Sequence, residues 1–203
     1  MGEESIMFLA PYAKWILLAV AVLYLTYIFA WKKESFKSAW VVAISAVMTA
    51  LVAVITIAIR VPTPATSGYI NIGDTMVMLS GVLFGPLVGA FAGGFGSALA
   101  DALGGYPHWA PFTLIIKGVE GWIVGYLVSK RSDFTVVLIA TILGGFLMVS
   151  GYFFVGVYLY GFGAALTEVP GNTLQAVSGI IVGGGVGYLI KRLYPQIESF
   201  IKA

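Results

Sequence analysis

Long uncharged apolar runs are the feature that most constrains this chain. Tyr12–Trp31 and Ser38–Ile59 each supply roughly 20 residues, the length that a helix needs to cross the hydrocarbon core of a bilayer. Hydrophobic residues make up 60% of the 203-residue chain and charged residues only 10%, which leaves too few polar side chains to cover a soluble domain. The sequence therefore predicts an all-α, multi-pass integral membrane protein.

Four more apolar stretches follow, at Asp74–Leu103, Ala110–Ser129, Phe134–Tyr160 and Thr173–Ile190. The first is about 30 residues long, so it forms either one tilted span or two short spans that fold back at Gly85-Pro86. A glycine followed by proline suits the end of one helix and the start of the next.

The distribution of basic residues favours the second alternative. With two spans, eight of the eleven basic residues lie on one side of the membrane; with one span they are divided between the two sides. The eight are Lys32, Lys33, Lys37, Lys130, Arg131, Lys191, Arg192 and Lys202. The positive-inside rule therefore predicts seven helices, with the N-terminus outside and the C-terminus in the cytoplasm.

The same topology gathers the remaining polar groups in the outer half of the protein. Three outward-facing connections, 60–74, 101–110 and 161–172, hold or adjoin the ionisable residues Arg60, Asp74, Asp101, His108 and Glu168. Lys117 lies about 10 Å and Glu120 about 15 Å below the outer end of their helix. This distribution predicts a pocket that opens outward.

Several of these residues have two interpretations. Lys117 and Glu120 share a helix face, and form either a self-neutralising buried pair or part of a ligand site. His108, with its neighbours Tyr106 and Trp109, offers either flat surfaces for stacking or anchors at the lipid interface.

The other polar candidates lie near predicted helix ends. Asp74 either caps its helix or faces the pocket. Asp101 is expected at a helix C-terminus, where the dipole disfavours an anion, and this indicates a specific role. Glu168, Asn172 and Gln175 supply hydrogen-bonding groups at the last outer connection.

Small residues recur at helical spacing. Gly85, Gly89, Gly93 and Ser97 are four residues apart, and we expect such stripes to pack the bundle by letting backbones approach. Ala43, Ala46, Ala50 and Ala53 form a flatter stripe that faces either another helix of the chain or a separate membrane partner.

Catalytic and cofactor motifs are missing from the sequence. The chain has no cysteine and one histidine, no P-loop, and no persuasive nucleophile–base arrangement. No inverted repeat with paired broken helices is visible. The sequence therefore predicts a membrane-embedded binding protein rather than an enzyme, with neither a cofactor nor a metal.

The block GYINIGDTMVMLSGVLFGPLVGAFAGGFGSALADALGGYPHWAPFTLIIKGVEGWIVG resembles the core of the substrate-binding S components of energy-coupling factor (ECF) vitamin transporters. It is most similar to the branch associated with hydroxymethylpyrimidine and pyridoxine uptake. The resemblance runs from about Ser38 to Ile190, and it implies a location in the plasma membrane of a prokaryotic cell.

The resemblance implies a six-helix bundle, here residues 38–203, preceded by an extra N-terminal helix and cytoplasmic linker in residues 1–37. It also implies partners: a membrane scaffold protein, met through an AxxxA-type motif that Ala46 and Ala50 match, and two cytoplasmic ATPases. The loop from Val61 to Gly73 corresponds to the gate over the ligand. The extra helix departs from the family pattern and leaves the partner open.

We therefore expect a subunit that binds a small vitamin or precursor for uptake, of the pyridoxine, hydroxymethylpyrimidine, thiamine or riboflavin type. The alternatives are a structural or assembly subunit without a ligand, and an autonomous carrier or channel. The predicted ligand contacts are Tyr69, Asn71, Asp74, Asp101, Tyr106, His108, Trp109, Lys117, Glu120, Glu168 and Asn172.

Overall fold

The computed structural model describes residues 38–197, together with the isolated positions 19, 22, 23 and 26. The predicted N-terminal span Tyr12–Trp31 and its linker lie outside this part of the chain, apart from those four positions. In the described part, five helical stretches are long and apolar enough to cross a membrane. They are Ala39–Ala58, Asp74–Gly104, Ala110–Lys130, Phe134–Tyr160 and Phe162–Leu193.

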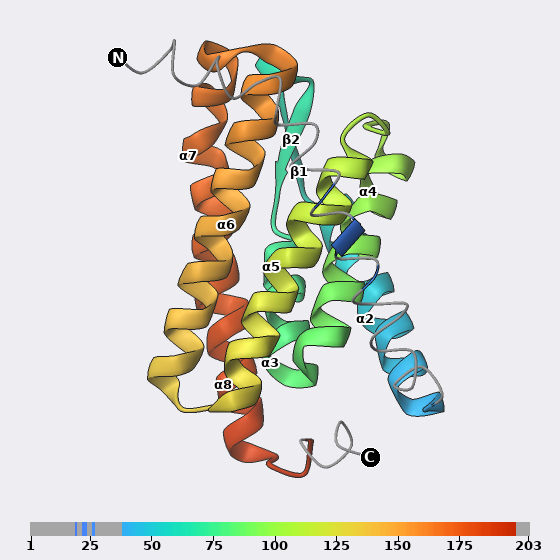
Figure 1. Cartoon of the computed structure of the whole chain (residues 1–203), viewed down its shortest axis with the longest axis vertical. Helices are drawn as coiled ribbons and strands as arrows, with labels where there is room; N and C mark the ends of the chain where they lie inside the picture. The colour runs from blue at the N-terminus through green and yellow to red at the C-terminus, as the bar shows by residue number, and fades with distance from the viewer. Residues whose placement is uncertain (1–18, 20–21, 24–25, 27–37, 198–203) are drawn as a thin grey trace.

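These stretches contain α2 (Ala39–Ala58), α3 (Asp74–Phe91), α4 (Ser97–Gly104), α5 (Ala110–Lys130), α6 (Phe134–Tyr160), α7 (Phe162–Ser178) and α8 (Gly185–Leu193). One turn of π-helix, η4 (Ala92–Gly96), joins α3 to α4, and a second, η5 (Gly179–Gly184), joins α7 to α8. The helices run side by side along the long axis of the molecule (Figure 1). A helical membrane protein was the expected class.

The chain reverses direction at Gly85, inside the stretch assigned to α3. Gly85 has φ 82° and ψ −174°, which is not helical, and Pro86 follows it. A Cβ added to Gly93 would lie 2.8 Å from Val77 Cγ1, whereas residues 16 apart in one straight helix are about 24 Å apart. Residues 74–84 and 86–104 therefore form the two arms of a helical hairpin, as the Gly-Pro pair predicts.

Glycines bring this hairpin into backbone contact with α5. A Cβ on Gly81 would lie 2.8 Å from the Gly121 carbonyl oxygen, and one on Gly121 would overlap the Gly89 carbonyl oxygen. Only glycine allows two helices to approach so closely. The predicted role of the glycine stripes in packing is confirmed here. The same packing keeps Asp74 of α3 in contact with Lys117 of α5.

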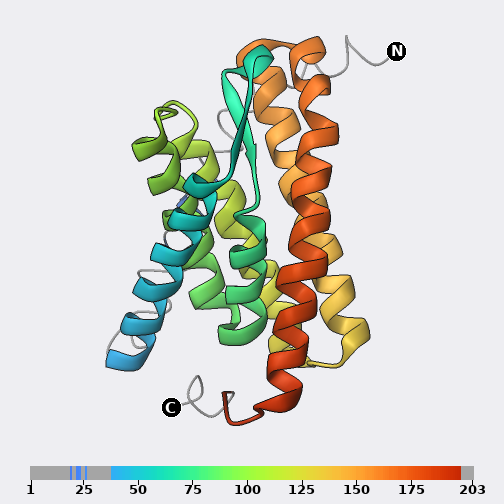
Figure 2. The same ribbon diagram turned by 180° about the vertical axis from the view of Figure 1, so that it is seen from behind.

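A short β-hairpin departs from the expected all-α class. β1 (Arg60–Thr63) pairs antiparallel with β2 (Gly68–Asn71), with Arg60 opposite Asn71 and Thr63 opposite Gly68. The short 3₁₀ turn η3 (Pro64–Thr66) and the left-handed Ser67 (φ 47°) connect them. The hairpin lies between α4 and α7 at one end of the molecule (Figure 2). Its proline- and glycine-rich sequence is typical of a loop, which is why composition alone did not reveal the strands.

The second departure is a correction. Residues 161–172 were expected to be an outer connection, but α7 begins at Phe162, directly after Gly161 (φ 87°). Its buried face carries Glu168, Asn172 and Gln175, while Leu166 and Leu174 are exposed. A helix with its polar face inward has low mean hydropathy, so a search for apolar runs misses it.

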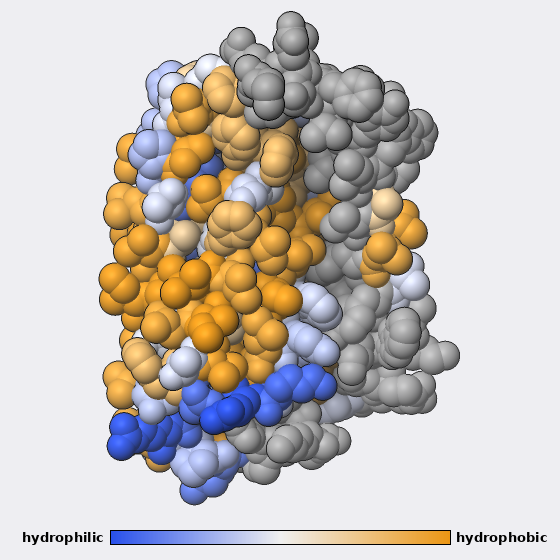
Figure 3. Space-filling view, turned by 60° about the vertical axis from the view of Figure 1, so that its left-hand side comes forward, coloured by the Kyte–Doolittle hydropathy of each residue, from blue (hydrophilic) through white to orange (hydrophobic). Residues whose placement is uncertain are grey.

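The two ends of the bundle differ in charge. α5 ends at Lys130 and α8 ends just after Lys191 and Arg192, at the end of the molecule opposite the β-hairpin (Figure 1). In Figure 3 a hydrophilic band lies at this end, below a broad apolar surface. The pocket described below lies at the opposite end of the bundle, beside the β-hairpin.

Candidate substrate-binding site

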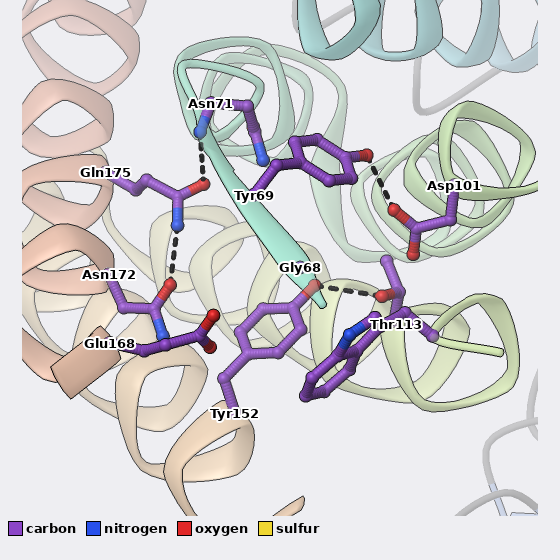
Figure 4. Close-up of a pocket in the computed structure, with 10 residues that line it drawn as sticks. Gly68, Tyr69, Asn71, Asp101, Thr113, Tyr152, Glu168, Asn172 and Gln175 are labelled. Atoms are coloured by element: carbon purple, nitrogen blue, oxygen red, sulfur yellow. Dashed lines mark hydrogen bonds between the residues drawn. The ribbon is translucent and has the colours of Figure 1, made fainter. Parts of the chain in front are cut away.

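A pocket with an empty volume of about 350 Å³, open to solvent, lies beneath the β-hairpin. It is lined by side chains from β2, α4, α5, α6 and α7 and by Trp109, which directly precedes α5 (Figure 4). The lining residues are Gly68, Tyr69, Asn71, Asp101, Trp109, Thr113, Tyr152, Glu168, Asn172 and Gln175. The lining residues come from five elements, and the first and last of them are more than 100 positions apart in the chain.

Asp101 presents a carboxyl group to the pocket, with Tyr69 and Thr113 as its neighbours. The Tyr69 hydroxyl donates to Asp101 Oδ1 at 2.6 Å, while Asp101 Oδ2 is buried and has no hydrogen-bond partner among the described residues. Burial and the neighbouring Asp101 carboxyl raise the pKa of Tyr69, so its phenol keeps its proton and continues to donate. A buried acceptor without a donor is costly, and a ligand donor would satisfy it.

Amide side chains from α7 form the opposite wall. The Asn71 backbone N–H donates to Gln175 Oε1 at 3.1 Å, and Gln175 Nε2 donates to Asn172 Oδ1 at 2.7 Å (Figure 4). These bonds orient both amides and attach β2 to α7. The wall thus presents donors and acceptors in fixed directions.

Glu168, one turn earlier on α7, holds the tip of the β-hairpin. Its Oε1 accepts from the Thr63 hydroxyl at 2.5 Å and from the Thr66 hydroxyl. Trp109 Nε1 donates to the Thr66 carbonyl oxygen at 3.3 Å from the other side. The hairpin is therefore fastened to both α7 and the start of α5, above the pocket.

Aromatic rings line the remaining surface. Trp109 is 4% exposed, and its ring centroid lies 5.8 Å from that of Tyr152 and 5.9 Å from that of Tyr160. The Tyr152 hydroxyl donates to Thr113 Oγ1 at 3.1 Å. Rings held this way offer flat faces to a planar ligand.

The charged residues that line the pocket are all acidic. Two carboxyl groups, Asp101 and Glu168, line it, and no lysine, arginine or histidine is among the lining residues. Such a site suits a neutral or cationic ligand that donates hydrogen bonds, and it disfavours an anion such as a phosphate ester.

The pocket brings together six of the residues predicted from the sequence: Tyr69, Asn71, Asp101, Trp109, Glu168 and Asn172. Tyr106 packs against Tyr69 with ring centroids 4.7 Å apart, and His108 is exposed, with its ring 6.2 Å from that of Trp109. Neither lines the pocket. Their predicted contact with a ligand stays a prediction.

Asp74, Lys117 and Glu120 do not line the pocket either. They form a separate buried cluster in which Lys117 Nζ contacts Asp74 Oδ1 and lies 3.5 Å from Glu120 Oε2. Lys117 is therefore shared between two acids rather than paired with Glu120 alone, and the predicted contact of these three residues with a ligand stays a prediction.

Three polar lining residues were absent from the predicted contacts. Gln175 was grouped with Glu168 and Asn172 but not chosen. Thr113 lies one turn before Lys117 on the same helix face, a signal that could have found it. Tyr152 sits in a long apolar run, where the sequence does not distinguish an inward aromatic ring from one that faces lipid.

The fastening of the hairpin leads to a prediction that needs no ligand. Thr66→Val keeps the shape of this buried side chain but removes the hydroxyl that donates to Glu168. We expect the backbone amides of β1 and β2 to exchange with deuterium about 10-fold faster, the effect of losing one hydrogen bond to a charged group. Thr173→Val, at an exposed position on α7, is the matched control. Equal exchange in both variants would contradict the role of Glu168 as a fastening point.

Comparisons with known proteins agree with this geometry. The model of a family described as "ECF-type riboflavin transporter, S component" matches residues 35–193. A Pyrococcus woesei protein known only as "Uncharacterized protein in gap 3'region" is 55% identical over 148 residues, 72% of this chain and 99% of that protein.

Two further relatives are similar to parts of the chain. The "Thiamine precursor transporter HmpT" of Lactococcus lactis is 31% identical over 148 residues, 72% of this chain and 85% of that protein. A UPF0397 protein of Streptococcus pneumoniae is 33% identical over 67 residues, about a third of each chain.

The family model covers most of the chain, including every helix that contributes to the pocket. The structure adds the apolar helices of a multi-pass membrane protein and a polar hollow at one end of the bundle. The chain therefore belongs to the family of membrane-embedded S components of ECF-type riboflavin transporters.

Proposed function

We propose that this chain captures a small, flat, water-soluble vitamin or vitamin precursor that donates hydrogen bonds and carries no anionic group. The observation that carries the proposal is the buried Oδ2 of Asp101, which has no hydrogen-bond partner in the described part of the chain, in a pocket whose described lining residues include no basic side chain. A ring amine or hydroxyl placed there satisfies the carboxyl group, and an aromatic ring beside it stacks on Trp109 or Tyr152.

The relatives narrow the ligand class without agreeing on one compound. The family description names riboflavin, and the Lactococcus relative is named for a thiamine precursor. The two carboxyl groups and three amides of the pocket suit an amino-substituted heterocycle, which pairs an exocyclic amine with a carboxyl group. We therefore favour a ligand of the thiamine-precursor type over the larger riboflavin.

We further propose that the described part forms six spans, with residues 74–84 and 86–104 counted separately, and that the pocket faces outward. The basic ends of α5 and α8, opposite the pocket, support this orientation by the positive-inside rule. A seventh span at Tyr12–Trp31 remains part of this proposal, as does the division into residues 1–37 and 38–203.

The proposed partners are an ECF membrane scaffold and two cytoplasmic ATPases. Ala46 and Ala50 are exposed on α2 and lie four residues apart, which leaves a flat strip where another helix can approach closely. The pocket itself offers no means of using ATP, so release of the ligand depends on partners that favour another state.

The proposal is tested by ligand identification and thermal shift on detergent-purified protein. Mass spectrometry of the extracted small molecules identifies a copurified vitamin, and a panel of hydroxymethylpyrimidine, thiamine, pyridoxine and riboflavin is screened for a rise in melting temperature. At 100-fold excess over Kd a ligand adds about 2.7 kcal/mol of stability, which such a scan detects. An empty protein that responds to none of the four favours a structural subunit instead.

The phosphorylated forms of the same compounds supply a sharper prediction. We expect each phosphate ester to bind at least about 100-fold more weakly than its parent, because none of the described lining residues is a cation that compensates a dianion beside Asp101 and Glu168. Competition by the esters against the best panel compound measures this ratio. Equal affinity of ester and parent would refute the charge argument.

A further inference from the structure

The buried cluster of Asp74, Lys117 and Glu120 carries an unbalanced charge. Lys117 Nζ contacts Asp74 Oδ1 and lies 3.5 Å from Glu120 Oε2. Side-chain exposure is 3% for Lys117 and zero for both acids. If all three groups are ionised, two negative charges face one positive charge inside a membrane-embedded bundle.

Among the described residues, Lys117 is the one cation that contacts the acids of this cluster. α6 packs Tyr152 against it, with the ring centroid 5.5 Å from Lys117 Nζ, and Gly144, where a Cβ would lie 3.5 Å from Glu120 Cγ. η5 contributes Gly179, whose Cβ would lie 3.0 Å from Asp74 Cβ. On the α4 side Asp101, another acid, interacts electrostatically with Lys117.

An uncompensated buried charge is far more costly than a proton taken from solvent. The surroundings of the two acids differ. Asp74 is in direct contact with the ammonium group and is the first residue of α3, where the helix dipole favours an anion. Glu120 lies in the middle of α5, and neither of its carboxyl oxygens has a hydrogen-bond partner among the described residues.

We propose that this cluster is a proton-binding site, in which Glu120 holds one proton while Asp74 and Lys117 form an ion pair. The cluster is then electrically neutral. The proton comes from water when the chain folds, since an exposed glutamate is ionised at neutral pH. The site is separate from the vitamin pocket and does not depend on which ligand the pocket takes.

Infrared spectroscopy of the purified protein tests the assignment directly. A protonated carboxyl group has a C=O stretching band above the amide I band, whereas an ionised one has carboxylate bands below it. We expect the wild-type spectrum at neutral pH to contain an acid band that the Glu120→Gln spectrum lacks. This band should move to lower frequency in deuterated water. Loss of the carboxylate bands instead would overturn the proposal.

A second variant keeps the test informative if Glu120→Gln does not fold. In Asp74→Asn, Lys117 is left with Glu120 as its only charged partner within the cluster, so Glu120 no longer needs a proton. The acid band should disappear and the number of ionised carboxyl groups should stay constant, although no glutamate has been changed. If Asp74→Asn simply removes one ionised carboxyl group, the wild-type cluster holds no proton and the proposal fails.

The pH dependence of stability is the third readout. A proton bound in the folded state and released on unfolding makes stability fall as pH rises. Between pH 6 and pH 8, the melting temperature of the wild type should therefore decline relative to that of Glu120→Gln, which lacks this proton. Parallel curves for the two proteins would contradict the proposal.

Discussion

Replacing Gly121 with alanine should lower the free energy of unfolding by about 3 kcal/mol or more, the upper end of the cost of overpacking a core. The added methyl group would overlap the carbonyl oxygen of Gly89, which is a backbone atom and cannot move aside as a flexible side chain could. α3 and α5 would have to move apart, and these helices carry Asp74 and Lys117 and lead to the pocket. We expect a melting temperature roughly 10 °C lower in detergent.

Gly185→Ala is the matched control for this prediction. Gly185 also lies in a helix, but beyond its own helix backbone a Cβ there would meet no atom of the described residues within 4 Å. Because alanine favours helix more than glycine by about 1 kcal/mol, this variant should be as stable as the wild type or slightly more stable. If Gly121→Ala melts at the same temperature as Gly185→Ala, the backbone contact between α3 and α5 is not as close as described.

The second large effect is expected at Asp101, where Asn removes the negative charge and keeps the shape. Asparagine can still accept from Tyr69, but it presents an amide instead of the free Oδ2 to a ligand donor. Breaking a buried charge-assisted pair typically costs 2–5 kcal/mol, so we expect affinity for the best panel compound to fall about 100-fold or more. Isothermal titration calorimetry on the wild type and the variant measures the ratio.

Asp133→Asn controls for the same chemical change at the far end of the bundle. Asp133 caps α6 by accepting from the Val136 backbone N–H at 3.3 Å, a role that asparagine also fills. The variant also loses an ion pair with Arg131, but that pair is exposed to solvent and adds little stability. We therefore expect unchanged affinity and nearly unchanged stability. Wild-type affinity in Asp101→Asn would show that Asp101 does not contact the ligand, and equal losses in both variants would point to a general effect on folding.

The class of the protein was predictable from the sequence because lipid imposes strong local rules. Every helix that crosses hydrocarbon needs a long apolar run, so Ser38–Ile59 and Phe134–Tyr160 could be located by composition. The reversal at Gly85-Pro86 was also predictable, since a positive φ at glycine and the fixed φ of proline act within two residues. The glycine stripe pointed to close packing for the same local reason.

α7 and the β-hairpin were not predictable in this way. α7 has its polar residues inside and leucines outside, so its burial depends on what the neighbouring helices present rather than on its own composition. The strands β1 and β2 are held by Glu168, Gln175 and Trp109, which lie about 40 to 110 residues away along the chain. No local pattern encodes such contacts.

The sequence by itself determined that this chain is a helical membrane protein with most basic residues on one side and the remaining ionisable groups toward the other, because apolar length and charge asymmetry are properties of each segment alone. Only the tertiary structure decided which of those groups share a pocket and which are sealed together. Asp101 and Lys117 both belong to the polar set, yet one lines the open hollow and the other lies beneath it between two acids. That division depends on distances between helices, which are set by the close backbone packing at Gly89 and Gly121.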